Sequence, residues 1–501
     1  MLLAARSVPL FVQVCALGAA AMYAPAIFGA ATRDLDAGRP FFYGATLFLI
    51  LLVLVGLATS RRTRRIDGRA YLATLLAIYT LLPVMLALPL REAVPASSFL
   101  NAYVEMVSAL TTTGASVFDP DRLPMTVHLW RGIVGWFGGL LIWITAFAVL
   151  APLTLGGFEV TSETEVGSGN ARVSGAYADP HDRVMRFAGR LTPIYVTLTA
   201  ALWLFLVIAG QQPASALLHA MATLSTSGIS TGQTVGEAGG GFGAELAVFA
   251  FFFFAVTRRL FEGGLHPDWH LIRRDRELRI ALIFISAVPV FLFFRHWVGA
   301  FEVDGTLNSE ALPALWGGIF MVLSFLTTTG LESASWDEAQ NWSGLQTPGL
   351  LLAGIALFGG GVATTAGGVK LLRVYALYKH GVREMERLIH PSSIGRAGYA
   401  GRRLRREGAA IAWIFFMLFA LSIAGVMALL SLTGIAFEES AILAIASLAT
   451  TGPVAVIASE APIVYSALPD MAKVILCGAM VLGRMETLAI LALLNPDFWR
   501  N

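Results

Sequence analysis

Long apolar stretches recur along the whole chain, separated by charged or polar segments, and most are long enough to cross a membrane. A spanning helix needs about 17–25 predominantly apolar residues to cross roughly 30 Å of hydrocarbon. We treat the first stretch as a retained span, because no convincing cleavage site and soluble domain follow it. The pattern predicts an all-α, polytopic membrane protein. The stretches lie near Val8–Phe28, Phe41–Leu57, Tyr71–Leu90, Val127–Leu150, Ile194–Ile208, Ala244–Val256, Ile280–Phe294, Gly349–Phe358 with its continuation, Ala409–Leu432 and Lys473–Leu494.

Four shorter segments alternate with the full spans, so that a span, a half-span and a span follow one another four times. At 1.5 Å per residue, most of these half-spans are too short to cross. They are Pro95–Leu110, Pro213–Leu224, Asn308–Leu326 and Glu438–Leu448, opened by the helix-starting residues Ser97, Pro213, Ser309 and Glu438. We therefore divide the chain into an N-terminal two-helix segment, 1–66, and four pore repeats, 67–160, 161–275, 276–400 and 401–501.

Each half-span ends in the same short motif of hydroxyl residues followed by glycine. We number these four segments filters one to four; they are Leu110–Gly114, Leu224–Gly228, Leu326–Gly330 and Leu448–Gly452. The copies are spaced by roughly 100–120 residues. The residue six positions before each glycine is always small: Ser108, Ala222, Ser324 and Ala446. One such phrase is an ordinary helix C-cap, but four at equivalent places predict a cation path lined by backbone carbonyls. Its candidate residues are Thr112, Thr113, Gly114, Thr226, Ser227, Gly228, Thr328, Thr329, Gly330, Thr450, Thr451 and Gly452.

The position of these phrases suits a cation. A half-helix leaves its chain at mid-membrane depth, where non-helical backbone survives only if it lines a cavity or is enclosed by protein. The C-terminus of the half-helix carries a partial negative charge. We expect the carbonyl groups that follow it to replace the water stripped from an ion.

Composition and charge supply the orientation. The chain is 56% hydrophobic and only 14% charged, unlike a soluble domain. Arginines crowd into Arg61–Arg69, Arg172–Arg190, Arg258–Arg279 and Arg373–Arg406, which the positive-inside rule places in the cytoplasm. The intervening acids, such as Glu237 and Glu332, should face outward and enrich cations near the pore mouth. The two cysteines, Cys15 and Cys477, lie in apolar stretches and are expected to be packing residues.

A glycine-rich run interrupts the second span of the third repeat. Gly359–Gly368 holds five glycines in ten residues, and a helix is poorly stable through such a run. We expect a loop there that obstructs the cytoplasmic exit of the pore, although a glycine-lined packing face is the alternative. Arg484 is an ionisable residue within the last span, which either snorkels or forms a cationic constriction paired with Glu486 or loop carbonyls. The gate candidates are Gly359, Gly360, Gly361, Thr364, Thr365, Gly367, Gly368, Lys370 and Arg484.

With these motifs, the sequence resembles the TrkH/KtrB superfamily of potassium transporters over nearly its whole length. In that superfamily each repeat keeps only the first glycine of the potassium-channel filter, and here Gly114, Gly228, Gly330 and Gly452 are all present. The resemblance implies potassium preference, with rubidium also passing, and the two extra N-terminal spans resemble the TrkH branch. The run Gly359–Lys370 resembles the family's intramembrane gate loop, and Gly483–Glu486 resembles the basic motif of its last span. Glu332 after the third filter and Pro453 after the fourth depart from the pattern.

The resemblance also implies partners and a location. We expect a multi-pass protein of the cytoplasmic (inner) membrane, surrounded by lipid and forming a homodimer. No G-x-G-x-x-G fingerprint follows a strand-like run, so regulation would come from a separate, TrkA-type nucleotide-binding subunit docked on the basic loops. Potassium ions in the filter are expected, but no covalently bound cofactor and no nucleic-acid partner.

Other functions remain as alternatives. Sodium- or proton-coupled cation symport fits the same pore. An alternating-access transporter of organic solutes fits less well, because such proteins usually show inverted or two-fold repeats. An enzyme is not expected. The histidines, among them His128, His219, His296 and His380, are scattered without metal spacing, and His266 and His270 flank Pro267 in a basic segment.

Overall fold

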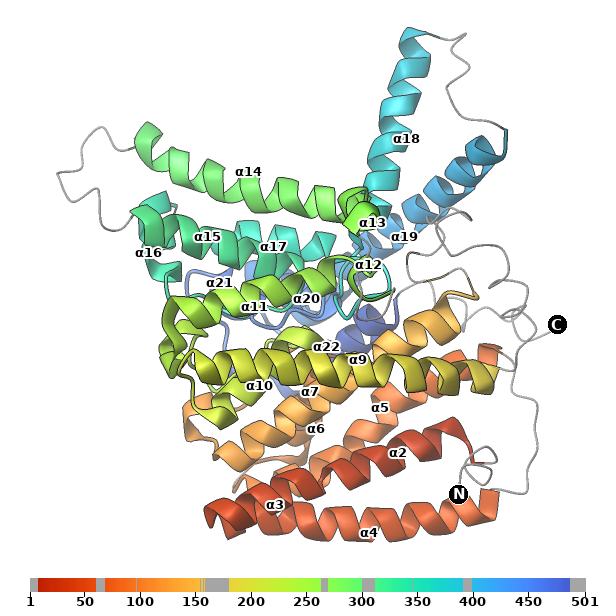
Figure 1. Ribbon diagram of the computed structural model, residues 1–501, viewed down its shortest axis with the longest axis vertical. Coiled ribbons are helices and arrows are strands. Elements are labelled where there is room, and N and C mark those ends of the chain that lie inside the picture. Colours follow the sequence, from red (N-terminus) through yellow and green to blue (C-terminus); the bar gives the residue numbers. More distant parts are fainter. Residues whose placement is uncertain are drawn as a thin grey trace.

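The computed structural model describes residues 8–59, 68–95, 97–153, 155, 157, 180–262, 269–299, 311–345, 347–390 and 399–486. Within these residues every regular element is helical (Figure 1), and eight helical segments are long and apolar enough to cross a membrane. The predicted all-α polytopic class is confirmed. Parts of the predicted basic connections, at 60–67, 158–179, 263–268 and 391–398, lie outside the described residues, as do positions 487–494 of the predicted last span.

Three helices form the N-terminal segment: α2 (Leu10–Ala21), α3 (Tyr23–Thr32) and α4 (Leu35–Thr59). The first predicted span is broken at Met22, where Pro25 in the next turn has no N–H to continue the hydrogen-bond ladder. Helix α4 lies at the edge of the bundle, and only 17% of its most apolar window is buried. Its exposed Leu47, Leu54 and Leu57 form an apolar surface that is suited to lipid.

The four repeats each contribute a long helix, a short helix and a second helix. The first consists of α5 (Gly68–Ala93), α6 (Phe99–Leu110) and α7 (Met125–Thr145), which ends in a wider turn, Ala146–Leu150. The second consists of α9 (Pro180–Ile208), α10 (Pro213–Ser225) and α11 (Gly241–Val256). The third consists of α14 (Arg276–Gly299), α15 (Ala311–Leu326) and α17 (Gly349–Phe358). The fourth consists of α19 (Tyr399–Ser431), α20 (Phe437–Leu448) and α22 (Asp470–Met485).

The remaining elements are connections between these helices. Within the repeats these are the turns Pro120–Arg122, Gly236–Gly240 and Tyr465–Ala467, together with α16 (Trp336–Ser343) and α21 (Val454–Ile457). Between successive repeats they are α12 (Arg259–Glu262), α13 (Trp269–Arg273) and α18 (Leu371–Ile389), which points away from the bundle in Figure 1. The interruption predicted in the third repeat is present, because α17 ends at Phe358 and the chain is not helical again until Leu371.

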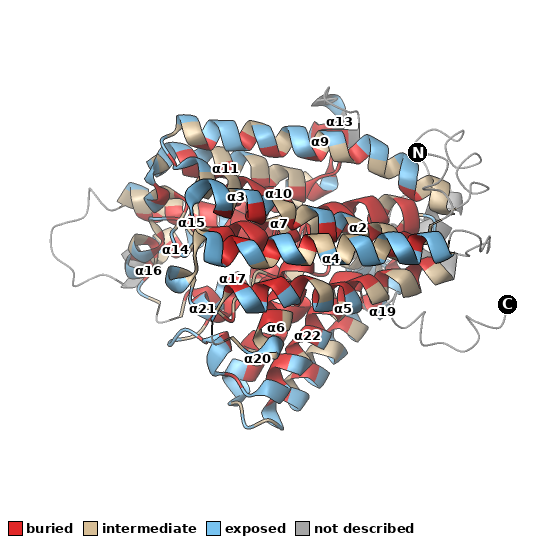
Figure 2. Ribbon diagram, turned by 90° about the horizontal axis from the view of Figure 1, so that it is seen from below, coloured by how far each residue is buried: buried red, intermediate tan, exposed pale blue. Residues whose placement is uncertain are grey.

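The short helices close the four repeats into a ring. Each packs against the second helix of the preceding repeat: α10 on α7, α15 on α11, α20 on α17, and α6 on α22. Buried residues accordingly gather in the middle of the bundle, while α4 and α9 carry many exposed ones (Figure 2). In α7, 67% of the most apolar window is buried. The C-terminal ends of the four short helices therefore meet at the centre.

The half-span starts differ slightly from the predicted ones. Ser98, rather than Ser97, caps α6, because its side chain accepts a hydrogen bond from the Asn101 N–H at 3.1 Å. Pro213 opens α10 as predicted. Glu438 lies in the first turn of α20, one residue after its start. Positions 308–310 lie outside the described residues, so the predicted start at Ser309 is not described.

Candidate functional site: a ring of four filter segments above a loop

The four short helices end in the same hydrogen-bonded turn. In each turn, the residue two positions before the glycine donates its N–H to the carbonyl three residues earlier. The next residue donates its N–H to the carbonyl five residues earlier, as in a Schellman motif. The longer-range bonds are Thr113 to the Ser108 carbonyl (2.8 Å), Ser227 to Ala222 (3.0 Å), Thr329 to Ser324 (2.9 Å) and Thr451 to Ala446 (2.8 Å). The small residues singled out in the sequence are thus the acceptors of these turns.

A left-handed threonine stands at the centre of every turn. The φ angles are +54° at Thr112 and Thr226, +57° at Thr328 and +53° at Thr450. This conformation is unfavourable for a β-branched residue, and strain of this kind persists where the surrounding structure enforces it. Among the described residues, the buried hydroxyls of Thr112 and Thr450 have no hydrogen-bond partner. All four turns therefore share the same backbone conformation, although it is strained.

Three of the four glycines are left-handed as well. Gly114 has φ +73°, Gly228 +61° and Gly330 +74°, whereas Gly452 is not left-handed. A chain that alternates between positive and negative φ turns successive peptide groups toward one side, which a β-strand does not do. Thr112–Gly114 and its two equivalents can therefore present consecutive carbonyl groups to a common path.

The filter glycines contact one another's segments in cyclic order. A Cβ at Gly114 would collide with the Ser227 carbonyl oxygen, and one at Gly228 with the Thr329 carbonyl oxygen. A Cβ at Gly330 would lie 2.8 Å from Pro453. The ring closes because the Gly452 N–H donates to the Thr113 carbonyl oxygen at 2.6 Å. Segments some 100 residues apart in sequence therefore form one continuous ring of backbone.

The fourth segment departs from the other three. Its Gly452 carbonyl accepts hydrogen bonds from the Tyr465 hydroxyl at 3.2 Å and from the Ala455 N–H at 3.1 Å. Pro453 then leads directly into α21. The departure noted in the sequence at Pro453 thus coincides with a distinct backbone conformation, and the ring is not fully four-fold.

The glycine-rich loop lies against three of the four filter segments. The Thr365 hydroxyl donates to the Leu224 carbonyl at 3.1 Å, next to filter two, and the Gly367 N–H donates to the Thr328 hydroxyl of filter three at 2.7 Å. A Cβ at Gly367 would collide with Thr450 of filter four. The loop is fixed from behind by Glu277, which accepts from the Val362 N–H at 2.7 Å. The close approach to backbone explains why glycine is needed at position 367.

Arg484 joins the last helix to this loop. Its Nη1 donates to the Thr365 carbonyl at 2.7 Å, and the side chain is buried. Of the two partners considered from the sequence, the loop carbonyl is the observed one, while Glu486 pairs instead with Arg373 at 2.7 Å. Lys370, also buried, donates to the Ala366 carbonyl at the end of the loop. A cavity of about 30 Å³ lies between the loop, α7 and α22, which is room for a water molecule.

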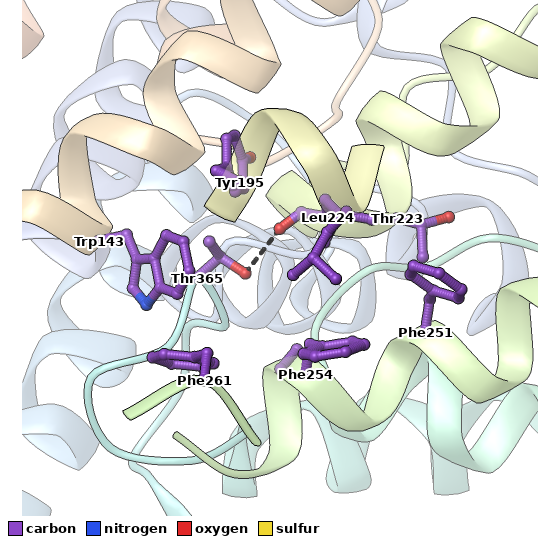
Figure 3. A pocket seen from close by; sticks show the side chains of 10 residues that line it. Trp143, Tyr195, Thr223, Leu224, Phe251, Phe254, Phe261 and Thr365 are labelled. Carbon is purple, nitrogen blue, oxygen red and sulfur yellow. Dashed lines mark hydrogen bonds between the residues drawn. The ribbon is translucent and has the colours of Figure 1, made fainter. Parts of the chain in front are cut away.

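Aromatic side chains flank the loop on the side of the second repeat. Trp143, Tyr195, Phe254 and Phe261 surround Thr365 and its hydrogen bond to Leu224 (Figure 3). The indole of Trp143 meets the Phe261 ring edge-on with centroids 4.5 Å apart. Together with Thr365 these rings line a small cavity of about 20 Å³.

Two buried carboxylates, neither of them among the residues predicted from the sequence, hold the chain just beyond filters one and three. Glu105 of α6 accepts from the Val117 N–H at 2.8 Å and pairs with Arg131 of α7 at 2.5 Å. Glu245 of α11 accepts from the Ala334 N–H at 2.7 Å. One sequence signal could have identified these sites, because an ionisable residue inside a predicted span or half-span is unusual. Arg131 and Glu245 carry this signal as much as Arg484 does.

Glu332 lies in the outer stretch after filter three and is partly buried. Burial, with the neighbouring carboxylates of Asp337 and Glu237, raises the pKa of Glu332 to about 7. Its carboxyl group therefore holds its proton at pH 6 and has largely lost it at pH 8. The segment that follows filter three therefore carries a charge that depends on pH near neutrality.

Comparisons with known proteins agree with this arrangement. The family described as "TrkH: Cation transport protein" matches residues 278–498. The Trk system potassium uptake protein TrkH of Vibrio parahaemolyticus is 30% identical over 97% of both chains, and that of Halomonas elongata is 32% identical over 85% of this chain and 84% of its own. The crystal structure of the potassium transporter TrkH from Vibrio parahaemolyticus superimposes with a TM-score of 0.81, at 26% identity over 99% of both chains. The chain belongs to the TrkH family of cation transport proteins.

Proposed function

We propose that this protein takes up potassium across the cytoplasmic membrane, through the ring formed by its four filter segments. The observation that carries the proposal is the cyclic contact between filters, in which each glycine abuts the next segment and Gly452 closes on Thr113. The names of the relatives, which are Trk potassium uptake proteins, support the choice of ion. Membership of this family leaves the organic solute transporter without support.

In this proposal, potassium sheds water as it enters the ring, and backbone carbonyls replace that water. The residues assigned to the path are those predicted from the sequence: Thr112, Thr113, Gly114, Thr226, Ser227, Gly228, Thr328, Thr329, Gly330, Thr450, Thr451 and Gly452. The alternating φ angles in the first three filters support this role. The Gly452 carbonyl is engaged by Tyr465, so we expect it to contribute least.

The loop Gly359–Lys370 acts as the gate in this proposal. This role is supported by its hydrogen bonds to Leu224 and Thr328, beside filters two and three, and by the bond from Arg484 to Thr365. A buried arginine at this level also repels a passing cation. Opening requires the loop to leave these partners, and we expect a TrkA-type nucleotide-binding subunit, docked on the basic side of a dimer, to drive it.

Growth tests the proposed uptake. Cells that lack their own potassium uptake systems should grow at low external potassium when they carry this chain, and a variant with Gly228→Asp, which places an acid against the Thr329 carbonyl, should not support growth. Failure of the wild-type chain to support growth while it is present in the membrane would count against potassium uptake.

A further inference from the structure

Glu245 is a buried acid in the fifth position of α11, within the second repeat, yet its contacts lie in the third. Its side chain is 3% exposed. Within the described part of the chain no basic side chain pairs with it, in contrast to Glu105 and its Arg131 partner. A buried carboxylate without a cation is costly unless several donors satisfy it. The hydrogen-bond donors to the Glu245 carboxylate therefore indicate its structural role.

Three groups of the third repeat donate to Glu245. The Ala334 N–H donates to Oε1 at 2.7 Å, and the Ser333 hydroxyl and the Trp316 indole N–H donate to Oε2 at 2.9 Å and 2.7 Å. Trp316 comes from the pore helix α15, and its ring is held between Phe242 and Phe249, with centroid distances of 4.8 Å and 5.4 Å. Two of the three donors belong to the chain that leaves filter three.

The other hydrogen bonds of this exit chain are between neutral groups, among them the Gly330 N–H to the Ser324 carbonyl at 3.3 Å and the Trp336 N–H to the Ser333 carbonyl at 3.2 Å. Ser333 is three residues after Gly330. Leu331 lies between them, and its carbonyl accepts a hydrogen bond from the Ser324 hydroxyl at 2.7 Å. The Val235 N–H approaches the Glu332 carbonyl only at 3.5 Å. Charged hydrogen bonds are stronger than neutral ones, so each bond to the carboxylate is expected to restrain this segment more than a neutral one does.

We propose that Glu245 is a positioning residue that holds filter three in its ion-selective shape from the neighbouring repeat. The inference rests on the filter function proposed above. Gly330 is left-handed, and a Cβ there would lie 2.8 Å from Pro453, so the chain beyond it has little room to move. Functional sites need their groups held to about 0.5 Å by surrounding hydrogen bonds. Glu105, which accepts from the Val117 N–H three residues after Gly114, holds the chain beyond filter one from within its own repeat.

The test is the ratio of rubidium to sodium uptake in liposomes, measured for wild-type protein and four variants of matched abundance. Glu245→Met keeps the approximate length of the side chain and removes both oxygens. Ser333→Ala removes one exit-chain donor and leaves Glu245 in place. Trp316→Phe removes the donor that does not belong to the exit chain, and Glu237→Gln removes an exposed charge whose hydrogen bonds, among the described residues, are to Thr234.

We expect Glu245→Met to lower the rubidium-to-sodium ratio about tenfold, equivalent to about 1.4 kcal/mol, and Ser333→Ala to lower it less. Trp316→Phe, which leaves both exit-chain donors in place, should lower the ratio less than Ser333→Ala does, and Glu237→Gln should keep the wild-type ratio. A folded Glu245→Met protein with the wild-type ratio would overturn the inference. If Glu245→Met does not fold, an unchanged ratio in Ser333→Ala overturns it, as would an equal loss in all four variants. An unselective wild type would instead sink the proposed filter function, and this inference with it.

Discussion

Arg484→Ala should open the pore in the absence of any cytosolic partner. The guanidinium donates to the Thr365 carbonyl at 2.7 Å from a buried position, and a hydrogen bond from a charged group is worth about 1.5–3 kcal/mol. Because about 1.4 kcal/mol corresponds to a factor of ten, loss of this bond alone should shift the loop toward the open state by at least tenfold. The fixed charge acts in the same direction. At an effective dielectric constant of 20, repulsion by the Arg484 charge raises the free energy of a cation about 6 Å away by roughly 3 kcal/mol.

The assay is initial rubidium uptake into liposomes, normalised to folded protein. Arg484→Ala should raise basal uptake about tenfold or more, whereas Arg484→Lys, which keeps both the charge and a donor, should stay near the wild-type rate. Uptake at or below the wild-type level in well-folded Arg484→Ala protein would refute the gate and leave Arg484 as a packing residue.

Two further predictions concern the gate and the outer mouth. Shortening Gly359–Gly368 should also raise basal rubidium uptake, and its effect should not add to that of Arg484→Ala, because neighbouring groups in one barrier couple in a double-mutant cycle; additive effects would mean two separate barriers. Because the pKa of Glu332 is raised to about 7, its charge appears as the pH rises from 6 to 8, and uptake at low ionic strength should rise over that range in the wild type but not in Glu332→Gln. A charge about 8 Å from the path in water should change local cation concentration roughly twofold, an effect screened at high salt; an equal loss at both salt concentrations would indicate a buried structural role.

Much of this architecture could be predicted from hydropathy and repetition. The spans, the four half-spans and the interruption after Phe358 follow from local composition, because apolar length and glycine content act over a few turns of chain. The first span was predicted as one helix although it breaks at Met22, since the effect of a single proline, Pro25, depends on its surroundings. The domain boundaries and the assigned roles of the filter and gate residues remain predictions.

The filter turns show where sequence reasoning ends. The repeated motif draws attention to its glycines, three of which are left-handed, whereas the left-handed residue common to all four repeats is a threonine two positions earlier, such as Thr112. Nothing in a β-branched side chain predicts that conformation, because tertiary packing imposes it. The role of Ser108 and its equivalents lies in a main-chain carbonyl, which every residue type possesses.

Long-range pairs were also beyond the sequence. Glu245 and Ser333 are 88 residues apart, and Glu486 could have paired with Arg484 on its own helix but reaches Arg373. An isolated charge in a span indicates only that some partner exists. Which partner it is depends on the cyclic order of the repeats, and the sequence does not state that order.

The most direct test of the central claim, that the four segments form one potassium-selective ring, is competition of potassium and sodium for rubidium uptake by purified protein in liposomes. The wild type should be blocked by potassium far better than by sodium. Gly114→Ser and Gly228→Ser, whose new side chains meet the Ser227 and Thr329 carbonyls, should lose that preference. Gly434→Ser, at a left-handed glycine with no atom within 4 Å of a new Cβ, should keep it. Equal block by sodium in the wild type, or unchanged preference in both filter variants, would contradict the account.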